Sequence, residues 1–202
     1  MSWFFFANYI YYETGSKLKK TVSTGSTMEY AAGYVYENDN LQFFDHPEGY
    51  VTPDGSGGYD YIHQYKDHFC NVRLSYTEDP GNPGTPTIIE ENNYYPFGLK
   101  HKGYKMGGDT TLGNDFAQRW KYNGMEIDES LGLETYDFGA RNYDPELGRW
   151  MNLDPLAEKM RRHSPYNYAY NNPISFIDPD GMLGMAAFGI SQGISGNVMG
   201  SM

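Results

Sequence analysis

The sequence of 202 residues contains a single cysteine, Cys70, and little positive charge. One cysteine excludes both an internal disulfide and a cysteine-based zinc site. The 15 lysines and arginines are outnumbered by 26 aspartates and glutamates, which gives a formal net charge of -11. Nucleic acids and anionic membranes attract positive charge, so the composition predicts neither of them as a partner.

Long apolar runs are also missing from the sequence. No stretch approaches the roughly 18 or more apolar residues of a membrane-spanning helix. The apolar start, residues 1–6, lacks the preceding basic segment and the small-residue cleavage site of a signal peptide. If the protein is exported, we expect its signal to lie upstream, in a longer parent protein that is secreted or held at the bacterial cell surface.

Aromatic and turn-forming residues are abundant. The chain has 20 Tyr and 11 Phe, while 24 Gly and 11 Pro interrupt it throughout. Tyrosine suits pleated surfaces, where the ring packs on one side and the hydroxyl stays in contact with water. The composition therefore predicts a mainly β protein without long helices.

Short β-type runs alternate with turn clusters, and connections this short predict antiparallel hairpins. The run of Lys17, Lys19 and Lys20 reads as a solvated strand face, and the acidic clusters at 37–39 and 126–129 read as solvated loops. The expected strands are residues 8–12, 17–23, 28–36, 41–45, 59–66, 71–77, 87–95, 118–122, 133–137 and 140–143.

Two helix-start signals stand near the C-terminal end of the sequence. Asp154 and Pro155 suit the N-cap and first helical position, with Glu158 in the first turn. Ser164 and Pro165 repeat the signal before residues 166–170. We expect two short helices at the edge of the sheet.

A weak internal repeat links distant parts of the chain. Residues 11–18 and 65–74 each run from tyrosines through an acidic residue and a turn into a basic-aliphatic strand. A hairpin of this kind cannot bury its own face and needs neighbours on both sides. Stacked hairpins predict a curved sheet or shell.

From Lys121 to Met182 the chain resembles the RHS repeat-associated core domain, which ends bacterial RHS and YD-repeat proteins. Two further segments, 67–73 and 94–99, also look like elements of this family. The matching blocks are YNGME (122–126), LGL (131–133), YDFGARNYDP (136–145), LGRW (147–150), DPLAE (154–158), SPY (164–166), NNP (171–173) and DPDG (178–181).

The resemblance implies a domain organisation. Residues 1–115 would be degenerate YD-repeat hairpins, 116–182 the core domain that plugs a hollow β-shell, and 183–202 a short variable tail. In relatives, a variable toxin follows the core and is held inside the shell, which implies an upstream repeat shell, a toxin segment and an immunity protein as partners. Only 20 residues follow Met182, too few for a folded enzymatic toxin.

The resemblance also implies a single self-cleavage after the last Asp-Pro motif, between Met182 and Leu183. Two carboxyl groups that share a proton supply both the acid and the base for peptide hydrolysis. Asp154 and Asp178, each before a proline and 24 positions apart, are the candidate pair, with Asp180 as a rival partner.

The same residues also have purely structural interpretations. Asp154 suits an ordinary N-cap, and residues 178–181 suit an ordinary turn. Arg149 is a candidate to support the aspartates, although both Arg149 and Arg141 read first as ion-pair partners. Relatives that cleave carry Leu where this chain has Met182, and their first motif has a glycine that is absent here.

Other chemistries are not favoured by the sequence. The five histidines lack metal-ligand spacing and the acidic clusters lack the calcium-loop pattern, so we expect no metal and no cofactor. No nucleophile set indicates a multiple-turnover hydrolase. The alternative function is an inert scaffold, an orphan core that binds carbohydrate or a cell surface through its tyrosines.

Overall fold

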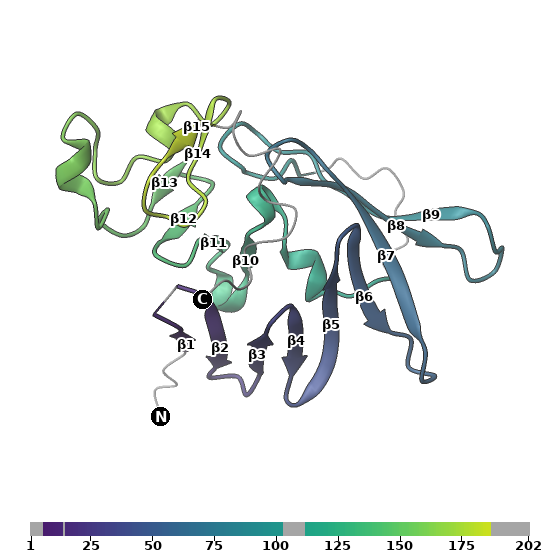
Figure 1. Ribbon diagram of the computed structural model, residues 1–202. Coiled ribbons are helices and arrows are strands. Elements are labelled where there is room, and N and C mark those ends of the chain that lie inside the picture. The colour runs from purple at the N-terminus through teal and green to yellow at the C-terminus, as the bar shows by residue number, and fades with distance from the viewer. Residues whose placement is uncertain (1–5, 14, 103–111, 187–202) are drawn as a thin grey trace.

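The computed structural model describes residues 6–13, 15–102 and 112–186, and most of its regular structure is antiparallel β-sheet (Figure 1). In the nine-stranded main sheet the strands stand in chain order, so each pairs with its sequence neighbours. They are β1 (Ala7–Tyr11), β2 (Lys17–Val22), β3 (Thr27–Ala31), β4 (Tyr34–Glu37), β5 (Asn40–His46), β6 (Gly49–Pro53), β7 (Tyr59–Lys66), β8 (Val72–Glu78) and β9 (Pro86–Glu91). The predicted mainly β class and antiparallel hairpins are confirmed.

The C-terminal part holds two smaller antiparallel sheets. Four strands form the first, β10 (Glu126–Asp128), β11 (Thr135–Asp137), β12 (Asn142–Asp144) and β13 (Arg149–Trp150), and two form the second, β14 (Phe176–Ile177) and β15 (Met185–Ala186). The remaining elements are 3-10 turns, η1 (Ala117–Arg119), η2 (Tyr122–Gly124), η3 (Ser130–Gly132), η4 (Ala157–Met160) and η5 (Ala169–Asn171). Within the described ranges, no helix has the length and hydropathy needed to cross a membrane.

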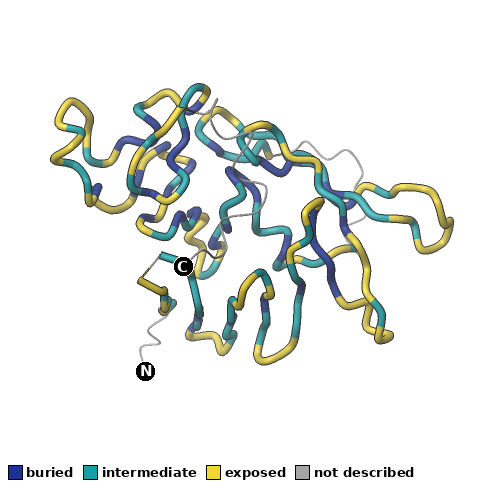
Figure 2. Tube along the Cα trace, viewed as in Figure 1, coloured by how far each residue is buried: buried dark blue, intermediate teal, exposed yellow. Residues whose placement is uncertain are grey.

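One face of the main sheet carries the first hydrophobic core. Side chains from β3 to β9 pack there beneath the segment that contains η1, whose Phe116 and Trp120 cover them. Figure 2 shows exposed residues concentrated at the hairpin turns and around η4. The buried members of this core are Met28, Val35, Phe43, Tyr50, Ile62, Ile89 and Ala117.

The second core, in the C-terminal part, is mainly aromatic. Tyrosine is tolerated in such a core because its hydroxyl can reach a polar partner. Tyr143, for example, donates to the carbonyl of Phe97 at 2.7 Å, and Tyr122 donates to the carbonyl of Pro96 at 3.1 Å. The buried members are Tyr122, Tyr136, Phe138, Tyr143, Trp150, Tyr168 and Ala169.

Several predicted elements need correction. The expected strand 28–36 is divided into β3 and β4 by a turn in which Ala32 and Gly33 both have positive φ. The expected strand 118–122 instead forms η1 and the start of η2, while β6 and β10 were not predicted.

The two predicted helices are also wrong. After Asp154-Pro155 the chain forms only the 3-10 turn η4, and after Ser164-Pro165 it makes an extended bridge at Asn167 before η5. Tyr170 within η5 has a φ of 55°, outside the right-handed region that an α-helix requires. Of the predicted tail, residues 187–202 lie outside the described residues.

Candidate functional site

The structure brings both predicted aspartates to one buried arginine, Arg141. Nη1 of Arg141 lies 3.2 Å from Oδ2 of Asp154, and Nη2 lies 3.1 Å from Oδ2 of Asp178. All three side chains are at most 3% exposed. We refer to Arg141, Asp154 and Asp178 as the arginine clamp.

Local turn geometry presents each aspartate to the clamp. Oδ1 of Asp154 accepts a hydrogen bond from the amide of Leu156 at 2.6 Å, and Oδ1 of Asp178 accepts one from the amide of Met182 at 3.0 Å. Each carboxylate thus uses one oxygen for its own turn and directs the other to Arg141. The structural and the chemical interpretations of these motifs are therefore compatible.

Arg141 lies in the loop 138–141 between β11 and β12, and further contacts fix its guanidinium. Its Nε donates to the carbonyl of Gly181, and its Cζ lies over the Trp150 ring, 4.3 Å from the ring centroid. Gly181 has a φ of 76°, and a Cβ there would lie 3.1 Å from the amide nitrogen of Arg141. A glycine therefore allows the second Asp-Pro motif to pack against the arginine.

The two carboxyl groups have different surroundings. Burial raises the pKa of Asp178 to about 6, and the nearby Asp180 adds to the increase while Arg141 opposes it. Oδ2 of Asp154 lies within ion-pair distance of Arg141 but accepts no hydrogen bond from any of the described residues. The clamp thus joins Asp178, whose pKa is raised by burial, to Asp154, whose Oδ2 faces the same guanidinium.

The expected cleavage site lies next to the clamp. The amide of Met182 donates to Asp178 and also to Oδ1 of Asp180, at 3.0 Å in each case. Leu183 is 43% exposed, so water can reach the chain at this point. Asp180 shares the Met182 amide with Asp178, and its carbonyl accepts from the amide of Ala140 at 3.2 Å.

Arg149 lies outside the clamp. It is exposed, and its guanidinium donates to the side-chain oxygen of Asn171. The ion-pair prediction is confirmed for Arg141, which was not predicted to support the aspartates. Both arginines stand in the blocks that carry the resemblance, and no local pattern distinguishes the buried one.

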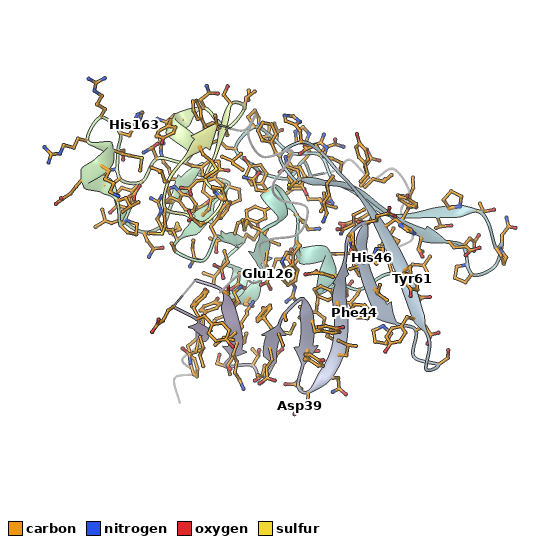
Figure 3. The ribbon with its side chains drawn as sticks, in the orientation of Figure 1. Asp39, Phe44, His46, Tyr61, Glu126 and His163 are labelled. Atoms are coloured by element: carbon orange, nitrogen blue, oxygen red, sulfur yellow. The ribbon has the colours of Figure 1, made fainter. Side chains whose placement is uncertain are left out.

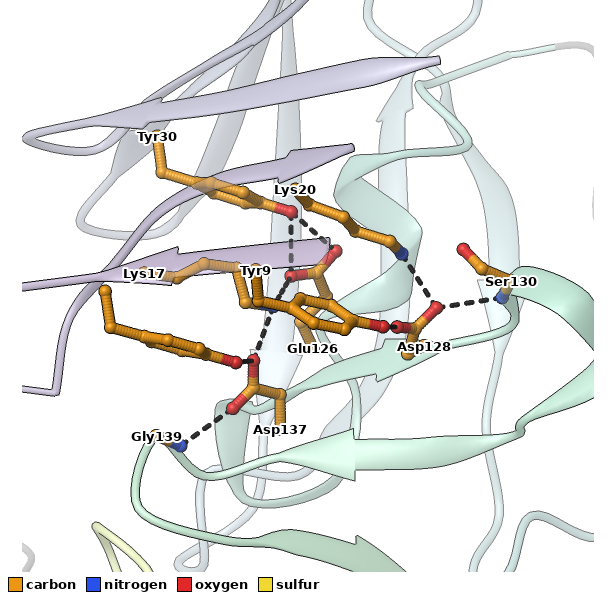
Figure 4. Close-up of polar contacts among 10 residues, drawn as sticks. Tyr9, Lys17, Lys20, Tyr30, Glu126, Asp128, Ser130, Asp137 and Gly139 are labelled. Carbon is orange, nitrogen blue, oxygen red and sulfur yellow. Dashed lines mark hydrogen bonds and ion pairs between the residues drawn. The ribbon is translucent and has the colours of Figure 1, made fainter. Parts of the chain in front are cut away.

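A second buried polar cluster joins the main sheet to the four-stranded sheet (Figure 4). Three carboxylates from β10 and β11 meet two lysines and three tyrosines from β1, β2 and β3. We call it the interface cluster; its members are Tyr9, Tyr11, Lys17, Lys20, Tyr30, Glu126, Asp128 and Asp137.

The interface cluster corrects two predictions. Lys20 is only 1% exposed, so the basic run is not a solvated strand face. Glu126 and Asp128 are each 5% exposed, so that acidic cluster is not a solvated loop. Among the described residues, no group of histidines, cysteines and carboxylates could hold a metal ion.

No family model matches the chain. Over 96 residues, 48% of the chain, it is 35% identical to salivary gland surface protein 1 of Aedes aegypti. Over 99 residues, 49% of the chain, it is 35% identical to toxin subunit YenC1 of Yersinia entomophaga. The fold matches a crystal structure of TcdB2-TccC3 without its hypervariable C-terminal region, with a TM-score of 0.59 over 87% of the chain at 19% identity.

The chain spans only a small part of each of these proteins. It covers 2% of the salivary gland protein, 9% of YenC1 and 9% of the TcdB2-TccC3 chain. Similarity in sequence to a toxin subunit and in fold to TcdB2-TccC3 is consistent with the RHS-type region that the sequence motifs indicate. The chain is thus similar to a short segment of much longer proteins, among them a toxin subunit.

Proposed function

We propose that this chain is the closing end of a bacterial RHS-type polymorphic toxin and that it cleaves itself once, beside Met182. Residues 1–115 extend a curved β-shell, residues 116–182 form the core that plugs it, and residues 183–202 begin the variable segment. The parent protein is secreted or displayed on the cell surface, and it carries a toxin segment for which an immunity protein exists.

The observation that carries the proposed cleavage is the arginine clamp. Asp154 and Asp178, distant in sequence, share one arginine immediately before the expected cleavage site. Unequal proton affinities are what a pair of carboxyls needs in order to work as acid and base at one pH. In the clamp, burial raises the pKa of Asp178, which suits this residue to the role of the acid.

The proposed reaction is hydrolysis of one peptide bond. Asp154, as the base, takes a proton from water, whose oxygen attacks the carbonyl carbon of Met182. Asp178, as the acid, gives its proton to the amide nitrogen of Leu183, and the carbon–nitrogen bond breaks. The first products are a carboxylic acid at Met182 and an amine at Leu183, while Asp154 holds the proton taken from water. The new acid at Met182 then releases its proton to solvent, and Arg141 keeps both aspartates in position throughout.

The intact mass of the purified chain tests this proposal. We expect the wild type to lose the mass of residues 183–202, and the Asp154→Asn and Asp178→Asn variants to keep it. Removing either the acid or the base should slow cleavage by roughly 100-fold or more. Arg149→Gln is the matched control and should cleave like the wild type, because Arg149 lies outside the clamp.

The outcomes of this experiment separate the alternatives. A chain that cleaves with Asp154→Asn but not with Asp180→Asn would make Asp180 the partner of Asp178. Full-length mass in all variants and in the wild type, together with a folded circular dichroism spectrum, would rule out the cleavage and leave an inert plug.

The second candidate function is saccharide binding on the aromatic face, which is the side of the main sheet opposite its core. Cross-strand pairing aligns Tyr34 with Phe44, Phe44 with Val51, and Val51 with Tyr61. Tyr61 is 55% exposed, and its ring lies 6.1 Å from that of His46 (Figure 3). Clustered exposed rings of this kind mark interaction surfaces.

This second candidate can be tested by titrating the chain with a soluble β-1,4-linked glucose oligosaccharide. NMR signals of the tyrosine rings report binding. We expect shifts of the Tyr61 signals that vanish in Tyr61→Ala, because a flat ring stacks on a sugar face. Tyr12→Ala is the control, since Tyr12 is as exposed but lies just after β1, away from the aromatic face. Unchanged ring signals at saturating sugar would count against the candidate.

A further inference from the structure

The interface cluster contains two sets of contacts, which we call the Asp137 arm and the Asp128 arm after the carboxylate at which each is centred. In one arm Lys17 lies 2.7 Å from Oδ2 of Asp137, and Tyr11 donates to the same oxygen at 2.9 Å. In the other arm Lys20 lies 2.7 Å from Oδ1 of Asp128, and Oδ2 of Asp128 accepts from the hydroxyl of Tyr9. Both arms join the same two sheets, yet only the first contacts the strand that precedes Arg141 (Figure 4).

A β-bulge places both lysines on one face of β2. Lys17 and Lys20 would point to opposite faces of a regular strand, because successive side chains alternate. The register shifts between Ile10 and Tyr11, so that Leu18 has no partner in β1 and Lys17 lies opposite Tyr11. An extra residue in one strand reverses the alternation beyond it.

On the other side of the interface, the carboxylates are aligned by ordinary pairing. Glu126 stands opposite Asp137 in the register of β10 with β11, and Asp128 is two residues further along the same face. Lys17 therefore bridges Glu126 and Asp137, at 2.7 Å from each. At 11% or less side-chain exposure, these pairs are only weakly screened by water.

Asp137 is hydrogen-bonded to the loop 138–141 and so helps to fix the position of this loop. Its Oδ1 accepts from the amide of Gly139 at 2.8 Å, and the amide of Phe138 donates to the carbonyl of Arg141 at 3.1 Å. Gly139 has a φ of 85°, and a Cβ there would lie 3.0 Å from the carbonyl oxygen of Gly15. The turn between β1 and β2 thus packs directly against this loop.

The loop is held from its other side by the second Asp-Pro motif. Ala140 donates to the carbonyl of Asp180 at 3.2 Å, and Arg141 donates to the carbonyl of Gly181. The short segment that carries Arg141 therefore has two sets of anchors. One comes from the N-terminal hairpin and the other from the residues before the expected cleavage site.

From these contacts we infer that Lys17 is a positioning residue for Arg141, acting through Asp137 and the loop 138–141. One expected consequence, a change in the rate of self-cleavage, rests on the proposed function. The other, a change in the pKa of Asp178, does not involve cleavage. When Arg141 is displaced, the Asp178 carboxyl loses the nearby positive charge, which opposes the increase in its pKa.

Two matched pairs of variants test the inference. Lys17→Met and Tyr11→Phe weaken the Asp137 arm, while Lys20→Met and Tyr9→Phe weaken the Asp128 arm by the same chemical change. The tyrosine variants remove only a hydroxyl and are therefore expected to fold. If a lysine variant does not fold, the comparison of Tyr11→Phe with Tyr9→Phe still tests the inference. The measurements are the rate of self-cleavage by intact mass and the pKa of Asp178 by carbon-13 NMR.

We expect only the Asp137-arm variants to raise the pKa of Asp178. Lys17→Met should slow cleavage about tenfold or more relative to Lys20→Met, because small misplacements of a catalytic group have large effects on rate. Equal effects from both arms, or an unchanged Asp178 pKa in the Asp137-arm variants, would overturn the inference. A wild type that never cleaves would instead overturn the proposed function, while the pKa would still decide whether Lys17 positions Arg141.

Discussion

Arg141→Met should lower the free energy of unfolding by about 3–5 kcal/mol, the effect of removing one partner from a buried ion pair. The variant leaves two buried carboxylates, Asp154 and Asp178, without their cation. It also removes the contact with the Trp150 ring and the donor to the Gly181 carbonyl. Urea denaturation, on samples of verified intact mass, gives the measurement.

The control for this prediction is Arg149→Met, which removes the same charge from an exposed position. We expect its effect to stay within about 0.5 kcal/mol, as for most surface substitutions. Adding Asp154→Asn and Asp178→Asn to Arg141→Met should restore part of the lost stability, because neutral amides do not need the cation. Equal losses from both arginine variants would show that the clamp does not stabilise the fold.

Asp178 should make the folded chain less stable as the pH rises from about 4 to about 6. Its pKa is about 6 in the folded chain, mainly because of burial, against an ordinary value of 3.8. In this range the folded state binds a proton that the unfolded state has released, so raising the pH favours unfolding. A difference of about two pKa units corresponds to about 3 kcal/mol.

The difference between wild type and Asp178→Asn isolates this contribution from that of other groups. In urea denaturation at each pH, we expect the variant not to show the loss of stability that the wild type shows between pH 4 and pH 6. The same slope in both proteins would mean that Asp178 titrates near its ordinary value. Asp128 affects the pH dependence of stability in the opposite direction. Its hydrogen bonds with Lys20 and Tyr9 outweigh the effect of burial and lower its pKa to about 2. The stability that Asp128 contributes is therefore lost only when the pH falls toward 2.

Local sequence patterns predicted the hairpins well because neighbouring strands pair. The expected strand 59–66 coincides with β7, and 17–23 with β2 to within one residue. The β6 strand was missed because Gly49 begins it. A Cβ there would lie 2.0 Å from the Ile62 carbonyl oxygen, so this glycine serves close packing rather than a turn.

The interface cluster could not be predicted from local patterns. The lysines of β2 and the carboxylates of β10 and β11 are more than 100 positions apart, and each set alone looks like a solvated surface. The bulge opposite Tyr11 also makes strict alternation misleading, since it would place Lys17 and Lys19 together. Only the paired partner explains why Lys20 is buried.

For the candidate site, the motifs predicted the aspartates but not the arginine between them. Asp154 and Asp178 are marked by the prolines that follow them, whereas Arg141 has no local signal that it is buried. Arg149 stands beside Trp150 in the sequence, yet it is Arg141 that stacks on the Trp150 ring. The position of a guanidinium depends on the loop that carries it, and that loop is fixed by tertiary contacts.

The chain order of the main sheet bears on how this protein forms during synthesis. Each of its nine strands needs only the strand just before it, so the sheet can grow hairpin by hairpin as the chain leaves the ribosome. The interface cluster can form only after residues 126–137 have been synthesised, because they carry its carboxylates. Until then, the lysines and tyrosines of the cluster are exposed to water. Charged groups at this edge keep the growing sheet soluble, and the arginine clamp is completed only after the main sheet has formed.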